Sequence, residues 1–147
     1  MKHRLVLSIV IGAFLAACGG ERPASEEASG PPRAPTAATE ARLVTPEEAR
    51  TLVEWPSGVL VVDVRTAEEY AAGHLPGARR VQLDEIEAAI DAGEFPATPD
   101  APLLVYCRAG SRSAQAAGLL SERGFQRVYD LEGGITAWGA AGQPVLR

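Results

Sequence analysis

The stretch from Leu104 to Ser113 carries the chain's most reactive combination of side chains. Within it, Cys107 stands between an apolar run that ends at Tyr106 and a helical pattern that starts near Ser113. A thiol at the start of a helix meets unpaired amide groups and the positive end of the helix dipole. These groups, and the guanidinium groups of Arg108 and Arg112, favour the thiolate, which is the nucleophilic form of cysteine. We therefore expect Cys107 to be a nucleophile.

The same loop is expected to bind an anion, because convergent amides at a helix start bind phosphate-like groups. Positive charge from Arg108 and Arg112 would add to this effect, and Arg112 is expected to lie nearer the sulfur atom. For Arg108, a solvated surface charge is the alternative to a direct contact. The expected anion site consists of Arg108, Ala109, Gly110, Ser111, Arg112 and Ser113.

Strands and helices alternate around this loop. Apolar runs predict strands over 59–64, 80–82, 103–106 and 128–129, and capping and periodicity predict helices over 45–55, 66–72, 84–92, 113–123 and 133–138. The alternation predicts an α/β fold with a parallel sheet and helices on both faces, which binds ligands beyond the carboxyl ends of its strands. Asp63 and Cys107 fall near such ends and could share a pocket. Asp63 is expected to orient or pair with an arginine of the loop, and Arg65 to serve structure.

Histidine and cysteine are too scarce to build a metal site, and no cofactor is expected. His74 is the only histidine beyond residue 3. It could act as a general base, but a role in packing the turn Gly73 to Gly77 is favoured, because an ionised thiol needs no base.

The first residues predict export and a lipid anchor. Residues 1–17 have the charged start, apolar centre and small-residue end of a signal peptide. Their end, Leu15-Ala16-Ala17 before Cys18, resembles the lipobox of bacterial lipoproteins, which implies lipidation of Cys18. The alternative is an ordinary secretory signal that ends in cysteine. Gly19 stands where the family pattern places the aspartate of inner-membrane retention, so a periplasmic protein anchored to the outer membrane is expected.

A tether is predicted over 18–42 and one domain over 43–147. The tether is rich in Pro, Ala and Glu and has no apolar periodicity, so it cannot bury enough surface to fold. Cleavage would remove the two cations Lys2 and Arg4 and lower the formal net charge from -5 to -7, which gives no support to nucleic-acid binding. With Cys18 lipidated, Cys107 would be the only thiol, and no internal disulfide could form.

Four segments of the chain match the pattern of one family. They are Val62-Asp63-Val64-Arg65 with Glu69-Tyr70, Gly73-His74-Leu75-Pro76-Gly77-Ala78, Cys107-Arg108-Ala109-Gly110-Ser111-Arg112-Ser113, and Leu131-Glu132-Gly133-Gly134 with Trp138 and Gly142-Gln143-Pro144-Val145. Together they resemble a single-domain rhodanese, over essentially all of residues 43–147. The resemblance implies a rhodanese-like sheet and a sulfurtransferase with a persulfide on Cys107. Its small donor would be thiosulfate, its acceptor cyanide or a thiol, and proteins could also donate or accept sulfur.

Three other functions are alternatives to sulfur transfer by an enzyme. A periplasmic sulfur carrier or reactive-sulfur-binding module with little turnover remains the main alternative. The related phosphatases and arsenate reductases place five residues between cysteine and arginine, whereas four separate Cys107 from Arg112, which argues against phosphate transfer. A thiol-disulfide oxidoreductase would need a second cysteine in a Cys-x-x-Cys pair.

Overall fold

The computed structural model describes residues 40–56 and 58–147. The predicted signal peptide, Cys18 and nearly all of the predicted tether lie outside these residues. No helix of the described part is long and apolar enough to cross a membrane. The strands are β1 (Arg42–Val44), β2 (Leu60–Asp63), β3 (Ala78–Arg80), β4 (Leu103–Tyr106) and β5 (Val128–Leu131). The helices are α1 (Pro46–Val53), α2 (Ala67–Ala72), the 3-10 turn η1 (Leu83–Glu85), α3 (Ile86–Asp91), α4 (Ser111–Glu122) and α5 (Gly134–Ala140).

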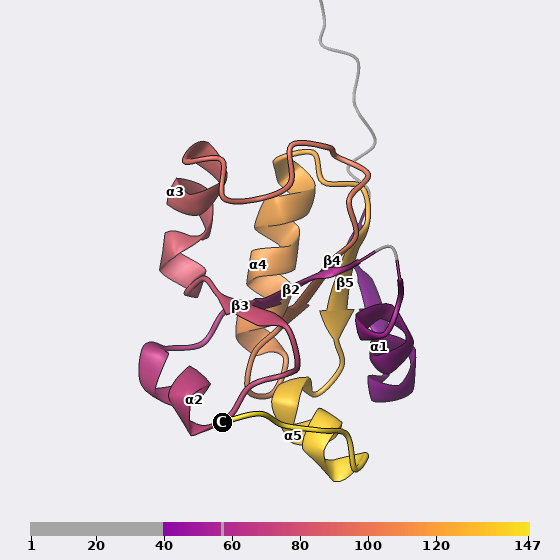
Figure 1. Cartoon of the computed structure of the whole chain (residues 1–147). Helices are drawn as coiled ribbons and strands as arrows, with labels where there is room; N and C mark the ends of the chain where they lie inside the picture. The colour runs from indigo at the N-terminus through magenta and orange to yellow at the C-terminus, as the bar shows by residue number, and fades with distance from the viewer. Residues whose placement is uncertain (1–39, 57) are drawn as a thin grey trace, which may run out of the picture. The chain divides into compact units, whose positions relative to one another are not determined.

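The five strands form one sheet in the order β1-β5-β4-β2-β3, and every neighbouring pair is parallel (Figure 1). The central strand β4 pairs with β2 through Asp63 opposite Tyr106, and with β5 through Val105 opposite Asp130. The carboxyl ends of β2, β4 and β5 therefore meet at one edge of the sheet. The predicted parallel α/β sheet is confirmed, and Asp63 and Cys107 lie near this edge.

Two apolar layers cover the sheet, and alternate residues of β4 point into each. Leu103, Val105 and Cys107 belong to the layer beneath α3 and α4, together with Ile86 of α3 and Leu120 of α4. Leu104 and Tyr106 belong to the opposite layer, which also holds Ala49 of α1 and Trp138 of α5. Helices thus lie on both faces (Figure 1), as predicted. Burial on both faces explains why β4 is a continuous apolar run.

Four local predictions differ from the structure. β1 was not predicted, because three residues beside a polar segment give too short a pattern. The strand predicted over 80–82 is β3, two residues earlier. The helix predicted over 84–92 is divided into η1 and α3, so Asp84 lies inside the 3-10 turn rather than at a helix cap. The helix predicted from Ser113 begins at Ser111, with Gly110 before it in a left-handed conformation.

Helices α1 and α2 begin in the same way. Thr45 and Thr66 each accept a hydrogen bond from the amide of the residue three positions later, and the carboxylates of Glu48 and Glu69 accept one from the threonine amides. Such a capping box satisfies two amides that the helix leaves unpaired. The predicted box of Thr45 and Glu48 is confirmed. The second box positions Glu69 at the edge of the sheet where β4 ends.

Candidate active site

Cys107 follows directly on β4, and the turn after it leads into α4. The amide of Gly110 donates a hydrogen bond to Cys107 Sγ at 3.1 Å. Gly110 has a φ of 110°, a conformation that glycine adopts far more readily than other residues. The thiol is buried, because Cys107 is only 1% exposed. Its sulfur therefore lies inside the curl of the loop at the start of α4, as the sequence predicted.

Two opposing effects act on the pKa of the Cys107 thiol. Burial raises it, because a thiolate loses hydration. Hydrogen bonds from the side chain and amide of Ser113, and from the amides of Gly110 and Ala109, lower it and outweigh burial. The pKa of Cys107 therefore lies below its ordinary value. The loop stabilises a negative charge on sulfur through its amides, as expected of an anion site.

Helix α5 holds the other side of this loop. The amide of Ile135 donates to the Cys107 carbonyl at 2.9 Å, and the amide and hydroxyl of Thr136 donate to the Arg108 carbonyl at 3.2 and 2.9 Å. The first amides of α5 are thus used by the chain itself. Two carbonyl oxygens of the loop are thereby bound to α5, while the Gly110 amide donates to the sulfur.

The two arginines of the loop have different surroundings. Arg112 makes a bidentate ion pair with Glu69 of α2, with Nη1–Oε2 and Nη2–Oε1 distances of 2.7 and 2.8 Å. Arg108 is exposed, and within the described part of the chain its guanidinium group has no hydrogen bond or ion pair. The sequence predicted positive charge at both positions but did not identify the carboxylate that neutralises Arg112.

Asp63 does not pair with an arginine of the loop. Its carboxylate binds Arg65 through Nε and Nη2, at 2.9 Å from Nε to Oδ1 and 2.6 Å from Nη2 to Oδ2, and Arg65 also donates to the Gly73 carbonyl. The Tyr106 hydroxyl donates to Asp63 Oδ2 at 2.5 Å and accepts from the amide of Leu75. The prediction that Asp63 pairs with an arginine of the loop is therefore wrong. Arg65 lies only two residues from Asp63 and forms a buried ion pair with it, which leaves the carboxylate with no need of a loop arginine. Arg65 is itself buried and joins Asp63 to the Gly73 carbonyl.

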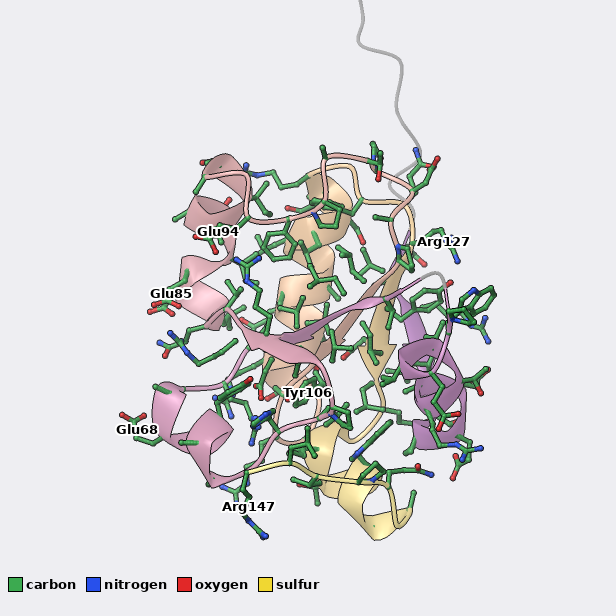
Figure 2. All side chains as sticks on the ribbon, viewed as in Figure 1. Glu68, Glu85, Glu94, Tyr106, Arg127 and Arg147 are labelled. Carbon is green, nitrogen blue, oxygen red and sulfur yellow. The ribbon has the colours of Figure 1, made fainter. Side chains whose placement is uncertain are left out.

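This buried group joins β2 to β4 below the reactive loop. Tyr106 lies inside the molecule, whereas the labelled glutamates lie at the surface (Figure 2). Burial and the Asp63 carboxylate raise the pKa of Tyr106, so the hydroxyl stays protonated and donates. The guanidinium of Arg65 also lies 5.5 Å from the centre of the Tyr106 ring. The polar atoms of Asp63 are thereby satisfied at a site that has no access to water.

His74 packs the turn, in agreement with the prediction. Its ring stacks on Tyr70 at a centroid distance of 4.0 Å, and its backbone pairs with Leu146 near the C-terminus, which lies beside α2 (Figure 1). In the part of the chain that the structure describes, no group of three or more His, Cys, Asp and Glu side chains could hold a metal ion.

A family model described as "Rhodanese-like domain" matches residues 45–141, which include the whole of this site. The chain belongs to the rhodanese-like family. It is 39% identical over 95 residues to a thiosulfate sulfurtransferase GlpE of Pseudomonas paraeruginosa, covering 65% of this chain and 81% of that one. It is 40% identical over 100 residues to the GlpE protein of Pseudomonas fluorescens, covering 68% and 86%. A protein of Allochromatium vinosum named sulfurtransferase is 41% identical over 88 residues, covering 60% and 78%.

Solved structures support the same rhodanese-like fold. A rhodanese-related protein of Thermoplasma volcanium has a TM-score of 0.61 at 28% identity, over 71% of this chain and 97% of that one. A protein of Rhodopseudomonas palustris, described as of unknown function and a possible tyrosine phosphatase, has a TM-score of 0.64 at 31% identity, over 72% and 85%.

Three residues of this rhodanese-like site were not singled out from the sequence. Tyr106 was assigned only to a strand, and Glu69 only to a helix and to a segment of the family resemblance, yet they bind Asp63 and Arg112. Asp130 of β5 is 6% exposed, and its Oδ1 has no hydrogen-bond partner among the described residues. The sequence could have indicated Asp130, because it is a charged residue in an otherwise apolar strand. A buried carboxylate there must find a hydrogen-bond partner or destabilise the fold.

Proposed function

We propose that this chain is a sulfurtransferase that carries a sulfane sulfur as a persulfide on Cys107. The observation that carries the proposal is the loop of amides around Cys107 Sγ, with the Gly110 amide at 3.1 Å. Such amides stabilise the attacking thiolate and would equally stabilise the anion of a persulfide. The names of the relatives, thiosulfate sulfurtransferase and sulfurtransferase, support this function, and the first supports thiosulfate as one of its donors.

The transfer takes two displacement steps. Cys107 thiolate attacks the outer sulfur of thiosulfate, a new S–S bond forms, and the S–S bond of the donor breaks with its electron pair leaving on sulfite. An acceptor such as cyanide or a thiolate then attacks the terminal sulfur of the persulfide, which yields thiocyanate or a new persulfide and restores the Cys107 thiolate. Neither step needs a metal or a redox partner, and the two steps predict ping-pong kinetics.

Loop size favours sulfur transfer over phosphate transfer. Four residues separate Cys107 from Arg112, and helix α4 already begins at Ser111. The Gly110 amide donates to the sulfur atom itself, and Ala109 and Ser113 also lower the pKa of the thiol. A single sulfur atom bound to Sγ fits this arrangement better than a tetrahedral phosphoryl group with three oxygens.

The decisive test is thiocyanate formation from thiosulfate and cyanide by the full chain and by Cys107→Ser, with intact-mass measurement of one added sulfur. The native chain is expected to turn over and to gain the sulfur, and the variant to do neither. Loading without turnover would favour the alternative, a sulfur carrier that needs a protein acceptor. Loading of Cys107→Ser, or no loading of the native chain by any small donor, would overturn the mechanism.

We also propose that the chain is a periplasmic lipoprotein, anchored through Cys18 and favouring the outer membrane. The support is the pattern of residues 1–17 followed by Cys18 and Gly19. Labelling cells with a radioactive fatty acid should mark the native chain in the outer-membrane fraction and leave Cys18→Ser unlabelled. Label in the inner membrane would overturn the assignment to the outer membrane, and an unlabelled native chain would overturn lipidation.

A further inference from the structure

The ion pair between Glu69 and Arg112 joins the reactive loop to a helix that is distant in sequence. Both terminal nitrogens of Arg112 bind the carboxylate, and each side chain is only about a third exposed. The bond to Arg112 is the main reason why the pKa of Glu69 falls to about 2. Glu69 is therefore ionised at every pH at which the protein would work, and its charge cancels that of Arg112.

This pair is held more firmly than most surface ion pairs, which contribute little because both side chains are free to move. Glu69 Oε2 also accepts the amide of Thr66 at 3.2 Å, while the Glu69 amide donates to the Thr66 hydroxyl. The capping box of α2 thus fixes the carboxylate before it binds Arg112. The geometry places a permanent negative charge beside the loop.

Arg112 is the second residue of α4, directly after the turn in which the Gly110 amide donates to Cys107 Sγ. The thiolate also raises the pKa of the Arg112 guanidinium, after the larger effect of Glu69. Without Glu69, the positive charge of Arg112 would attract an anionic donor that binds at the sulfur. Arg108, the other arginine, is exposed and has no ion pair among the described residues. One free positive charge, rather than two, is left to attract a donor to the loop.

We propose that Glu69 is a specificity-determining residue: by neutralising Arg112 it makes the loop discriminate against doubly charged sulfur donors in favour of singly charged ones. This inference rests on the proposed sulfurtransferase function and adds the charge class of the donor. Thiosulfate, a dianion, would react despite Glu69, and donors such as thiosulfonates and organic persulfides with one negative charge would be the better substrates.

Two small donors isolate the effect of charge. Methanethiosulfonate has a methyl group in place of one anionic oxygen of thiosulfate, so the two are similar in size and deliver the same outer sulfur. In each reaction the Cys107 thiolate forms one S–S bond and breaks another, and the electron pair leaves on sulfite or on methanesulfinate. No proton is taken up. Differences in intrinsic reactivity cancel when variants are compared by the ratio of kcat/KM for the two donors.

The test compares the full native chain with Glu69→Gln, using cyanide as the acceptor for both donors. Glutamine keeps an acceptor for the Thr66 amide but removes the charge. The ratio of kcat/KM for thiosulfate to that for methanethiosulfonate is expected to rise about tenfold. This is the size of effect expected when the freed charge of Arg112 attracts the second negative charge of thiosulfate across a partly screened distance. Added salt should reduce this gain, because the pair is partly exposed.

Glu48→Gln is the matched control. Glu48 occupies the same place in the capping box of α1, but its partner at 2.6 Å is Arg42 of β1, which does not belong to the loop. Its ratio should equal that of the native chain. An equal fall with both donors in Glu69→Gln would show that Glu69 only positions Arg112, and an unchanged ratio would show no role; either overturns the inference. If methanethiosulfonate and thiosulfate both failed to load Cys107, the proposed function itself would be overturned.

Discussion

Gly134 packs against Cys107 so closely that a β-carbon on Gly134 would lie 2.4 Å from the Cys107 carbonyl oxygen. The same carbonyl accepts the amide of Ile135, the next residue of α5, at 2.9 Å. The absence of a side chain at Gly134 is thus what allows α5 to reach the backbone of the reactive loop. The loop is fixed by a helix that follows it in sequence, as well as by the helix it leads into.

Gly134→Ala should therefore be severely destabilising. The new methyl group would overlap backbone atoms of Cys107 and Arg108, and the φ of 58° at Gly134 is unfavourable for alanine. We expect a loss of about 3 kcal/mol or more in the free energy of unfolding. Thermal denaturation followed by circular dichroism would measure it.

Gly139→Ala is the control, because Gly139 lies in the same helix with open space around its α-carbon. Replacing this glycine should leave stability unchanged or raise it by roughly 0.5–1 kcal/mol, the usual gain from alanine in a helix. Equal effects of the two substitutions would contradict the steric role of Gly134.

The sequence was most informative where one chain segment determines its own structure. Residues 103–106 are all apolar, and all four are buried in β4. This run alone predicts the strand, and Cys107 follows directly after it. The capping residues Thr45, Pro46 and Glu48 likewise mark the start of α1 through contacts with their own helix. Such local signals do not depend on the rest of the fold.

Contacts between distant segments could not be predicted in the same way. Glu69 and Arg112 are 43 positions apart, and nothing in either segment indicates that α2 and α4 meet. Asp63 has candidate arginine partners in its own segment and in the loop, and the choice of Arg65 depends on the path of the chain after β2. The strand β1 is recognised only by its pairing with β5, because its own three residues carry little pattern.

Tyr106→Phe should destabilise the fold because it leaves a buried carboxylate with one donor fewer. The Tyr106 hydroxyl donates to Asp63 and accepts from the amide of Leu75, so two buried groups lose a partner. A loss of about 2 kcal/mol in the free energy of unfolding is expected, as for hydrogen bonds to charged groups. Urea denaturation would measure the loss.

Tyr129→Phe is the control for this substitution, since the described structure gives the Tyr129 hydroxyl no hydrogen bond. It should change the free energy of unfolding by less than about 0.5 kcal/mol. A similar loss in both variants would mean that the Tyr106 hydroxyl adds nothing beyond the packing of its ring.

Ser113→Ala should raise the pKa of the Cys107 thiol. The Ser113 hydroxyl lies among three acceptors, the Gly110 carbonyl at 3.0 Å, the Cys107 sulfur and Asp130, but has only one hydrogen. Once the thiol ionises, donation to the thiolate gains most, because hydrogen bonds to charged groups are the stronger ones. Loss of the hydroxyl should therefore raise the pKa of the Cys107 thiol toward its ordinary value. Thiolate absorbance in the ultraviolet, followed against pH, would measure the shift.

The control is Ser121→Ala on the same helix, where the hydroxyl donates to the Ala117 carbonyl further along α4. The pKa of Cys107 should be unchanged in this variant. A thiol pKa that also stays unchanged in Ser113→Ala would mean that the backbone amides of the loop alone stabilise the thiolate.

Asp130→Asn should stabilise the fold at neutral pH and not in acid. Burial raises the pKa of Asp130, and the bond with Ser113 offsets this only in part, so the folded state binds the proton more tightly than the unfolded state. Below the ordinary carboxyl pKa of about 4, both states are protonated and ionisation costs nothing. As pH rises through the raised pKa of the folded state, the cost of a buried charge appears, and stability falls to a lower plateau. Asparagine carries no charge and avoids this loss.

The expected gain of Asp130→Asn is on the order of 1 kcal/mol near pH 7, disappearing near about pH 3 to 4. Urea denaturation over this pH range would measure it, with Asp100→Asn as the control, because Asp100 is exposed and should show no pH-dependent gain. A positive difference in the free energy of unfolding, variant minus native, near pH 7 would support a cost of the buried charge. If the Asp130→Asn variant were less stable than the native chain by the same amount at every pH, Asp130 would contribute through its shape and hydrogen bonding, and its buried charge would impose no cost.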